Sequence, residues 1–161
     1  MDYSVFIHSG PDGHFCIIAL YVDDLMILSD DAMSLSHHKG DLMKTFKMKD
    51  LGPIHWFLGL DIMRDRVQCL ISVSQGHYIA DVISHFGFTN SHPISTPINV
   101  NFKLPSLDSP KINVRNYQSH IGSIMYAMLG TCPDIAYAVG ALSQFSANPG
   151  TDHLTAVNHL L

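Results

Sequence analysis

Two adjacent carboxylates, Asp23 and Asp24, are the residues of this sequence that point most directly to chemistry. They lie between two apolar runs, residues 15–22 and 25–28. Like charges repel, and apolar flanks make the desolvation of both carboxylates costly unless a cation compensates them. Mg²⁺ prefers hard oxygen ligands and is commonly held by one or two carboxylates together with substrate phosphates. Two such ions, about 3.5–4 Å apart, can activate an attacking hydroxyl and stabilise the leaving oxygen in phosphoryl transfer.

The position of the pair decides whether both aspartates can serve one site. Neighbouring side chains of a strand point to opposite faces of a sheet, so adjacent aspartates in mid-strand could not share a metal. The two apolar runs predict strands, and the simplest arrangement is a β-hairpin with the aspartates at its tip. Aspartate is also a common turn residue, so the pair could serve only to close the hairpin. The tetrapeptide 21–24, taken alone, favours this structural interpretation over the catalytic one.

A helix is expected directly after this hairpin. Ser29, Asp30 and Asp31 are N-cap candidates for a helix that continues to about residue 48. Its apolar residues have the spacing of one helical face, which we expect to be buried. The residues expected on that face are Leu35, Leu42, Met43 and Phe46.

The remaining elements follow in a simple order. Residues 54–64 and 67–74 predict two strands, and Ser74 is the N-cap candidate of a following helix. Residues 87–113 hold four prolines together with many serines and asparagines, which indicates a linker. Beyond the linker, helices are expected over residues 114–129, over residues 133–145 and from near residue 151. Strand-rich and helix-rich parts in succession are typical of an α+β fold.

The composition limits the partners and compartments that we expect. The 161 residues have a net charge of −5, with 9 basic residues against 14 acidic ones, all of them Asp. A chain so poor in bases disfavours polynucleotide binding, whose usual mark is a basic patch. The 11 histidines and three cysteines show no spacing typical of a zinc site. The three widely spaced cysteines, the N-terminal residues and the short apolar runs indicate an intracellular protein, cytoplasmic or nuclear, neither secreted nor in a membrane.

A series of short segments resembles one branch of the reverse transcriptases, that of the Ty1/copia-type retrotransposon polyproteins. In chain order they are residues 21–24 for Y-x-D-D, 48–52 for M-K-D-L-G, 57–59 for F-L-G, 71–79 for L-S-Q-x-x-Y-I, 95–97 for S-T-P, and 117–139 for Y-x-x-x-[IV]-G-S-L-x-Y followed by R-P-D-I-A-Y-A-V. Each segment alone is weak evidence. Their order and spacing together make a strong resemblance, which covers the chain from residue 2 to about residue 153.

The resemblance implies an RNA-directed DNA polymerase that adds deoxynucleotides to a primer on an RNA or DNA template. Asp23 and Asp24 would be two of the three palm aspartates that bind two Mg²⁺ ions. Phe57, Leu58 and Gly59 would form the hairpin that grips the primer terminus. The implied partners are the template-primer, the deoxynucleotide and the remainder of the polyprotein, with palm and fingers upstream and ribonuclease H downstream.

Six of the nine bases lie within residues 39–66, beside the primer-grip-like hairpin. Contacts of these bases with phosphates would make binding strongly dependent on salt. A solvated helix face and a strand end explain the cluster at least as well. The residues weakly indicated as nucleic-acid contacts are Lys44, Lys47, Lys49, Arg64 and Arg66.

The resemblance also divides the chain into parts. Residues 1–88 would be a partial palm with both hairpins, residues 89–113 a proline-rich linker, and residues 114–161 a truncated helical region like a thumb or connection. The third aspartate and the fingers would belong to an upstream segment, so the chain alone is expected to be inactive.

The chain departs from the family pattern at a few positions of the helical part. These are Cys132 in place of Arg, Leu154 in place of Trp, and Asn158 and His159 in place of a Lys-Arg pair. Loss of bases at such positions leaves a second interpretation open. In that interpretation the chain is a domesticated or decayed remnant that binds nucleic acid or protein without catalysis.

Overall fold

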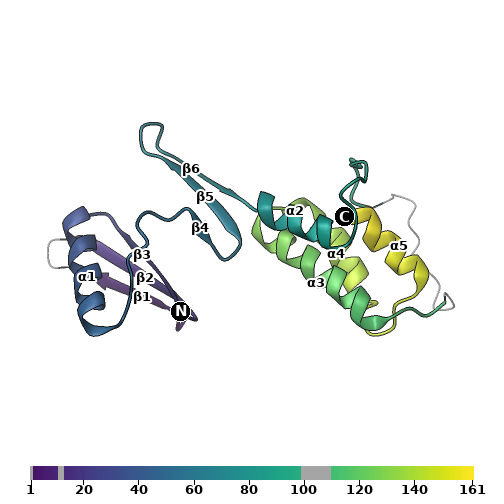
Figure 1. The fold of residues 1–161 in the computed structure, drawn as a ribbon, viewed down its shortest axis with the longest axis horizontal. Coiled ribbons are helices and arrows are strands. Elements are labelled where there is room, and N and C mark those ends of the chain that lie inside the picture. The colour runs from purple at the N-terminus through teal and green to yellow at the C-terminus, as the bar shows by residue number, and fades with distance from the viewer. Residues whose placement is uncertain (1, 11–12, 99–109) are drawn as a thin grey trace. The chain divides into compact units, whose positions relative to one another are not determined.

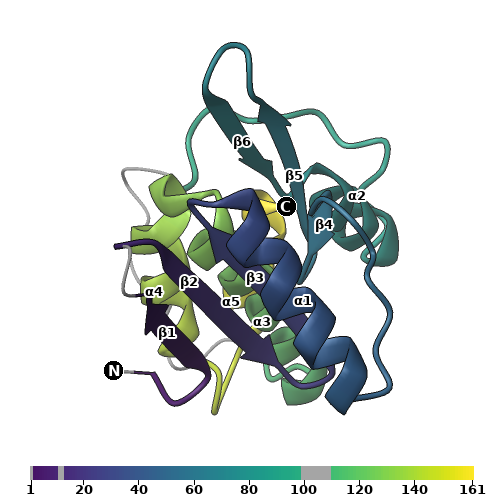
Figure 2. The same ribbon diagram turned by 90° about the vertical axis from the view of Figure 1, so that its left-hand side faces the viewer.

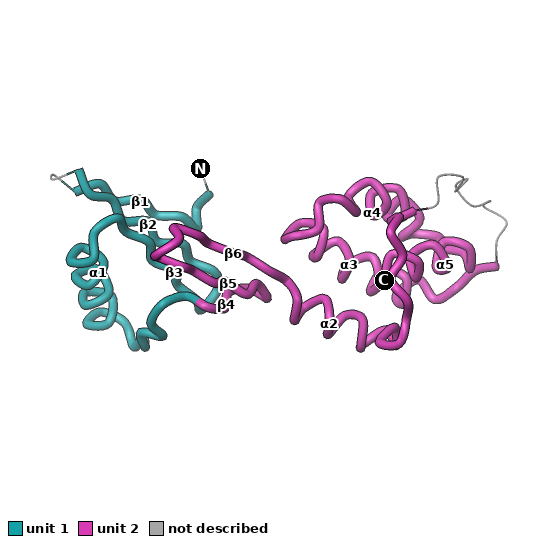
Figure 3. Tube along the Cα trace, turned by 90° about the horizontal axis from the view of Figure 1, so that it is seen from above, with its two compact units in different colours: residues 1–54 teal, residues 55–161 magenta. Residues whose placement is uncertain are grey.

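The computed structural model describes residues 2–10, 13–98 and 110–161. The chain forms two compact units, residues 1–54 and residues 55–161, coloured separately in Figure 3. The described part contains two three-stranded antiparallel sheets and five α-helices, which confirms the predicted α+β class (Figure 1). The predicted division into residues 1–88, 89–113 and 114–161 is based on the family pattern and not on compact units, and it stays a prediction.

The first unit is a small sheet with one helix across it. Its strands are β1 (Val5–Ser9), β2 (Phe15–Tyr21) and β3 (Asp24–Ser29), in the order β1-β2-β3. The predicted hairpin is confirmed, because β2 pairs with β3 antiparallel from Cys16–Ser29 to Tyr21–Asp24. Helix α1 (Ala32–Thr45) lies across these strands in Figure 2.

Helix α1 begins where the sequence predicts and ends three residues early. The Asp31 carboxylate accepts the Ser34 N–H at 2.6 Å, which makes Asp31 the N-cap. Leu35 and Leu42 are half-buried, as expected of a helix on a sheet. The predicted burial of Met43 and Phe46 is wrong, since they are 45% and 54% exposed. Phe46 is the C-cap, with extended backbone, so it leaves the helical face, and Met43 lies 100° around the helix from Leu42.

The sheet of the second unit consists of β4 (Trp56–Phe57), β5 (Leu60–Asp65) and β6 (Leu70–Ser74), in that order. The predicted strand over residues 54–64 is wrong in one respect, because Leu58 and Gly59 reverse the chain and separate β4 from β5. The predicted strand over residues 67–74 begins only at Leu70. The Asp65 carboxylate accepts the N–H groups of Val67 and Gln68, two and three residues later, at 2.8 and 3.0 Å and closes a turn there.

The helices of the second unit follow this sheet. They are α2 (Gly76–His85), α3 (Val114–Gly130), the 3₁₀ turn η1 (Pro133–Ile135), α4 (Ala136–Ser143) and α5 (Thr151–Leu160). The helix expected over residues 133–145 is therefore a 3₁₀ turn and a shorter α-helix. Ser74 is not the N-cap of α2; that position belongs to Gln75, while the Ser74 hydroxyl accepts the Gly76 N–H at 3.1 Å.

A well-buried core lies among α3, α4 and α5. Its buried side chains are Tyr117, Ile121, Ile124, Val139, Leu142, Ala156 and Val157. In the predicted linker, the described residues 89–98 and 110–113 form neither helix nor strand apart from one bridge between Lys111 and Gly150. Residues 99–109 of that prediction lie outside the described residues. Among the described helices, none is long and apolar enough to cross a membrane.

Candidate functional site

The aspartate pair lies at the tip of the β2–β3 hairpin, as the sequence predicts. Tyr21 pairs with Asp24 across the hairpin, so Val22 and Asp23 are the two residues of the loop. Asp24 is the first residue of β3, and both aspartates are exposed. Because Asp23 lies in the loop, strand alternation does not force the two carboxylates onto opposite faces. The tip can therefore present both carboxylates to one ligand.

Val22 gives this tip a strained backbone. Its φ is +52°, a region that L residues rarely adopt and that is a genuine outlier for a β-branched side chain. Two-residue hairpin loops that need positive φ normally use Gly, Asn or Asp there. The Val22 side chain is also 79% exposed, so burial does not explain the choice of valine. Strain and exposed apolar surface at one point are typical of a functional site rather than of a turn chosen for stability.

The aspartate tip has the donor chemistry that Mg²⁺ prefers. In the part of the chain that the structure describes, no group of three histidine, cysteine or acidic side chains could hold a metal ion. Mg²⁺ keeps several waters and binds through one or two carboxylates with substrate phosphates, so a pair of exposed carboxylates fits it without a third. Asp23 and Asp24 as metal ligands remain a prediction.

The residues predicted to grip the primer form a tight turn. Phe57 pairs with Leu60 across the β4–β5 hairpin, which leaves Leu58 and Gly59 as the loop. Their φ values are +51° and +76°, as a type I′ turn requires at both central positions. The hydroxyl of Tyr126, on α3, donates a hydrogen bond to the Leu58 carbonyl.

Comparison with known proteins decides the family. Residues 2–100 match the family model described as reverse transcriptase (RNA-dependent DNA polymerase). The chain belongs to the reverse transcriptase family. Both the aspartate tip and the turn at Leu58 and Gly59 lie inside the matched stretch, and the resemblance seen in the sequence motifs is confirmed.

The similar proteins are polyproteins of transposons. The chain is 41% identical over 167 residues to the retrovirus-related Pol polyprotein from transposon TNT 1-94 of Nicotiana tabacum, covering 99% of this chain and 13% of that protein. It is 34% identical over 143 residues to the polyprotein from transposon RE1 of Arabidopsis thaliana, covering 88% of this chain and 10% of that protein. The chain thus spans about an eighth or less of these relatives. No solved structure matches it significantly.

Three of the predicted nucleic-acid contacts of this reverse transcriptase chain lie in the first unit. Lys44, Lys47 and Lys49 are all exposed, at the end of α1 and on the segment after it. The Lys44 ammonium donates to the Asp41 carboxylate at 3.2 Å, and this contact holds the pKa of Asp41 below its usual value. Lys44 is therefore partly engaged within its own helix, which fits the alternative of a solvated helix face.

The other two predicted contacts lie in the second unit. Arg64 is exposed on β5, and Arg66 is exposed in the turn between β5 and β6. The two arginines thus share one hairpin end of the second unit. Nucleic-acid contact by any of the five bases remains a prediction.

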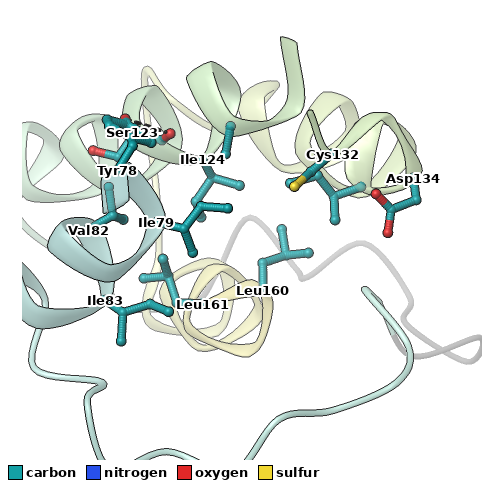
Figure 4. A pocket seen from close by; sticks show the side chains of 12 residues that line it. Tyr78, Ile79, Val82, Ile83, Ser123, Ile124, Cys132, Asp134, Leu160 and Leu161 are labelled. Atoms are coloured by element: carbon teal, nitrogen blue, oxygen red, sulfur yellow. Dashed lines mark hydrogen bonds between the residues drawn. The ribbon is translucent and has the colours of Figure 1, made fainter. Parts of the chain in front are cut away.

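A pocket of about 160 Å³ lies among α2, α3, η1 and the end of α5 (Figure 4). Aliphatic side chains make most of its lining, including Ile79, Ile124 and Leu160. Asp134 is the one acidic side chain among its lining residues, and no basic side chain of the described residues lines it. The described lining therefore offers no basic side chain to a nucleotide phosphate.

Sequence reasoning missed two residues next to the primer-grip-like turn. Tyr126 appeared only as one letter of a family segment, although its hydroxyl reaches Leu58. Gln75 is 1% exposed and bonds to α3 through both ends of its amide. The available signal was that Gln75 is a polar residue directly between a predicted strand and a predicted helix.

Proposed function

We propose that this chain supplies the Y-x-D-D hairpin of an RNA-directed DNA polymerase, which adds deoxynucleotides to a primer on an RNA or DNA template. The observation that carries the proposal is the hairpin tip, where a strained Val22 directly precedes two exposed carboxylates. Membership of the reverse transcriptase family supports the same chemistry.

Asp23 and Asp24 would hold Mg²⁺ at this tip. When bound, two such ions supply charge to an attacking hydroxyl and a leaving phosphate oxygen. The two carboxylates would determine where the ions bind. Their own position is held by the paired backbone of β2 and β3 on both sides of the loop. The turn of Phe57, Leu58 and Gly59 would hold the primer terminus, with Lys44, Lys47, Lys49, Arg64 and Arg66 as weaker contacts to the nucleic-acid backbone.

The active protein would be longer than this chain. No third carboxylate joins Asp23 and Asp24 among the described residues, and the relatives are about eight to ten times longer. We infer that the remaining palm, the fingers and a ribonuclease H domain are partners within one polyprotein. Copying RNA into DNA would place the protein in the cytoplasm or nucleus.

Primer extension with Mg²⁺ tests this proposal in two proteins. The first is the 161-residue chain alone, and the second is the TNT 1-94 polyprotein with its matching segment replaced by this chain. We expect extension only from the chimera, and a loss of at least a hundredfold in Asp23→Asn and in Asp24→Asn. Asp81→Asn, at an exposed position of α2, is the matched control and should leave extension unchanged.

Two outcomes would contradict the proposal. Extension that survives Asp23→Asn in the chimera would remove the aspartate tip from the chemistry. A chimera that binds template-primer but never extends it, while the unaltered relative does, would favour the non-catalytic remnant. Template-dependent extension by the chain alone would contradict only the expectation that it needs the longer protein.

A further inference from the structure

The turn at Leu58 and Gly59 needs support from outside its own hairpin. Both residues have positive φ, and leucine in that region is unfavourable because its Cβ crowds the backbone. Asn-Gly and Asp-Gly are the pairs that form such turns readily. Strand β4 has two residues, so the local sheet contributes little pairing to hold the turn. A backbone conformation of this kind persists only where surrounding contacts determine it.

Tyr126 supplies such a contact from a helix 68 residues later in the sequence. Its hydroxyl donates to the Leu58 carbonyl. A Cβ placed on Gly59 would lie 3.5 Å from the same hydroxyl, so the phenol lies directly beside the second turn residue. The Tyr126 hydroxyl therefore bonds to the first central residue of the turn and covers the second.

Tyr126 is itself held by side chains of the β6–α2 junction. The Gln75 amide Nε2 donates to the Tyr126 carbonyl at 3.2 Å, and the Gln75 Oε1 accepts the Thr131 N–H at 2.8 Å. Gln75 is buried with both ends of its amide satisfied, which makes it costly to move. A Cβ on Gly130 would collide with that amide, so α3 approaches Gln75 as closely as a glycine permits.

Tyr78 completes the support. Its ring packs edge-to-face on the Tyr126 ring with centroids 4.8 Å apart. Its hydroxyl donates to the Ser123 carbonyl at 3.0 Å, one turn earlier on α3 (Figure 4). The hydroxyl is partly buried, and this desolvation raises the pKa of Tyr78, so the side chain stays a neutral donor.

We propose that Tyr126 is a positioning residue for the primer terminus, acting by fixing the Leu58–Gly59 turn against α3. This rests on the proposed function only in assigning the primer to that turn. Gln75 and Tyr78 hold the phenol in place, and the phenol holds the turn. Any movement of α3 is thereby transmitted to the residues that would grip the primer.

The test uses Tyr126→Phe, which removes the hydroxyl and keeps the ring. Tyr137→Phe is the matched control, because Tyr137 lies on α4 and is 79% exposed. Hydrogen exchange is measured on the full chain without nucleic acid. We expect the amides of Phe57 and Leu60, which pair across the turn, to exchange about five- to tenfold faster in Tyr126→Phe, as loss of one hydrogen bond allows. The control and the amides of α4 should not change, which also shows that the variant folds.

The second measurement is primer extension by the chimera at varied primer concentration. We expect Tyr126→Phe to raise KM for the primer about five- to tenfold with kcat little changed. Unchanged exchange at Phe57 and Leu60 would overturn the positioning role of Tyr126. Faster exchange with an unchanged KM for the primer would overturn its connection to the primer. A chimera without any activity would instead contradict the proposed function. The hydrogen-exchange measurement on the chain would still decide whether Tyr126 holds the turn.

Discussion

The helices after the linker and the sheet of the first unit bury their apolar residues very differently. Helices α3, α4 and α5 enclose seven buried side chains, four of which, Tyr117, Val139, Leu142 and Val157, are at 0% exposure. Among the described residues of the first unit, Cys16 is the one buried hydrophobic side chain. The aspartate tip therefore belongs to the first unit, whereas the larger buried core belongs to the helices of the second unit.

The register of the first sheet explains the difference. Residues paired directly across antiparallel strands share a face, so Ile7 and Leu28 lie on the same face as Ile17. Ile7 and Leu28 are 57% and 44% exposed, and Tyr21 on the same face is 54% exposed. One helix covers one face of a sheet, whereas three helices can cover one another. A contiguous apolar face of this kind normally marks a contact with further protein.

A pair of matched truncations tests this contrast most strongly. Leu142→Ala empties a fully buried position of the helical core and should cost about 2–5 kcal/mol of unfolding free energy. Leu25→Ala truncates a half-buried side chain of β3 and should cost about 1 kcal/mol. Hydrogen exchange resolved by element measures each loss where it arises, in α3 and α4 for the first variant and in β2 and β3 for the second. Equal costs for the two variants would remove the contrast.

A smaller effect is expected from relieving strain at the aspartate tip. Val22→Gly removes a side-chain clash worth about 1–2 kcal/mol at positive φ and adds about 0.5–1 kcal/mol of chain entropy cost. The net change should be a gain of about 0.5–1 kcal/mol in the β2–β3 hairpin, measured as slower exchange of its amides. Val73→Gly, in the extended strand β6, is the control and should lose stability. A loss from Val22→Gly as large as that control would show that Val22 is not strained.

The smallest expected effect is a pH dependence located in the helical core. His153 is 1% exposed, and its Nδ1 accepts the Gly150 N–H at 2.8 Å, so the ring is neutral in the fold. Burial lowers the pKa of His153, against the opposing charge of Asp152. The unfolded chain then binds more protons than the folded one, and stability falls as pH drops below about 6.5, until the folded pKa is passed.

The matched variant for this pH effect is His153→Gln, which keeps an acceptor for the Gly150 N–H and cannot titrate. We expect thermal unfolding of the variant to lose the part of the acid dependence that His153 contributes. His77 acts with the opposite sign, because its hydrogen bond to Asp61 raises the pKa of His77. That contribution remains in both proteins, so the difference between them isolates His153. Identical pH profiles would contradict the assignment.

Local chemistry made several features predictable. The apolar runs around Asp23 and Asp24 predicted the β2–β3 hairpin, and the candidates Ser29, Asp30 and Asp31 included the N-cap of α1. Helix α3 begins at Val114 as predicted, since Asn113 accepts the N–H groups of its first turn. These features depend on neighbours within a few residues, so the sequence contains their causes.

Other features depended on contacts between distant residues. The reversal at Leu58 interrupts a segment that the sequence predicts as one strand. Leucine locally disfavours positive φ, so nothing in the local sequence indicated a turn there. The exposure of Met43 depends on how much of α1 a three-stranded sheet can cover. No local pattern shows that the amide of Gln75 is buried against α3.

The sequence by itself determined the hairpin that carries Asp23 and Asp24 and the membership of the reverse transcriptase family. Periodicity, turn residues and motif order are properties of residues close in the sequence, so they can be recognised from the sequence alone. Only the tertiary structure decided that Tyr126 touches Leu58 and that the buried core lies among the last three helices. Those results arise because burial and hydrogen bonding act between residues close in space, whatever their separation in sequence.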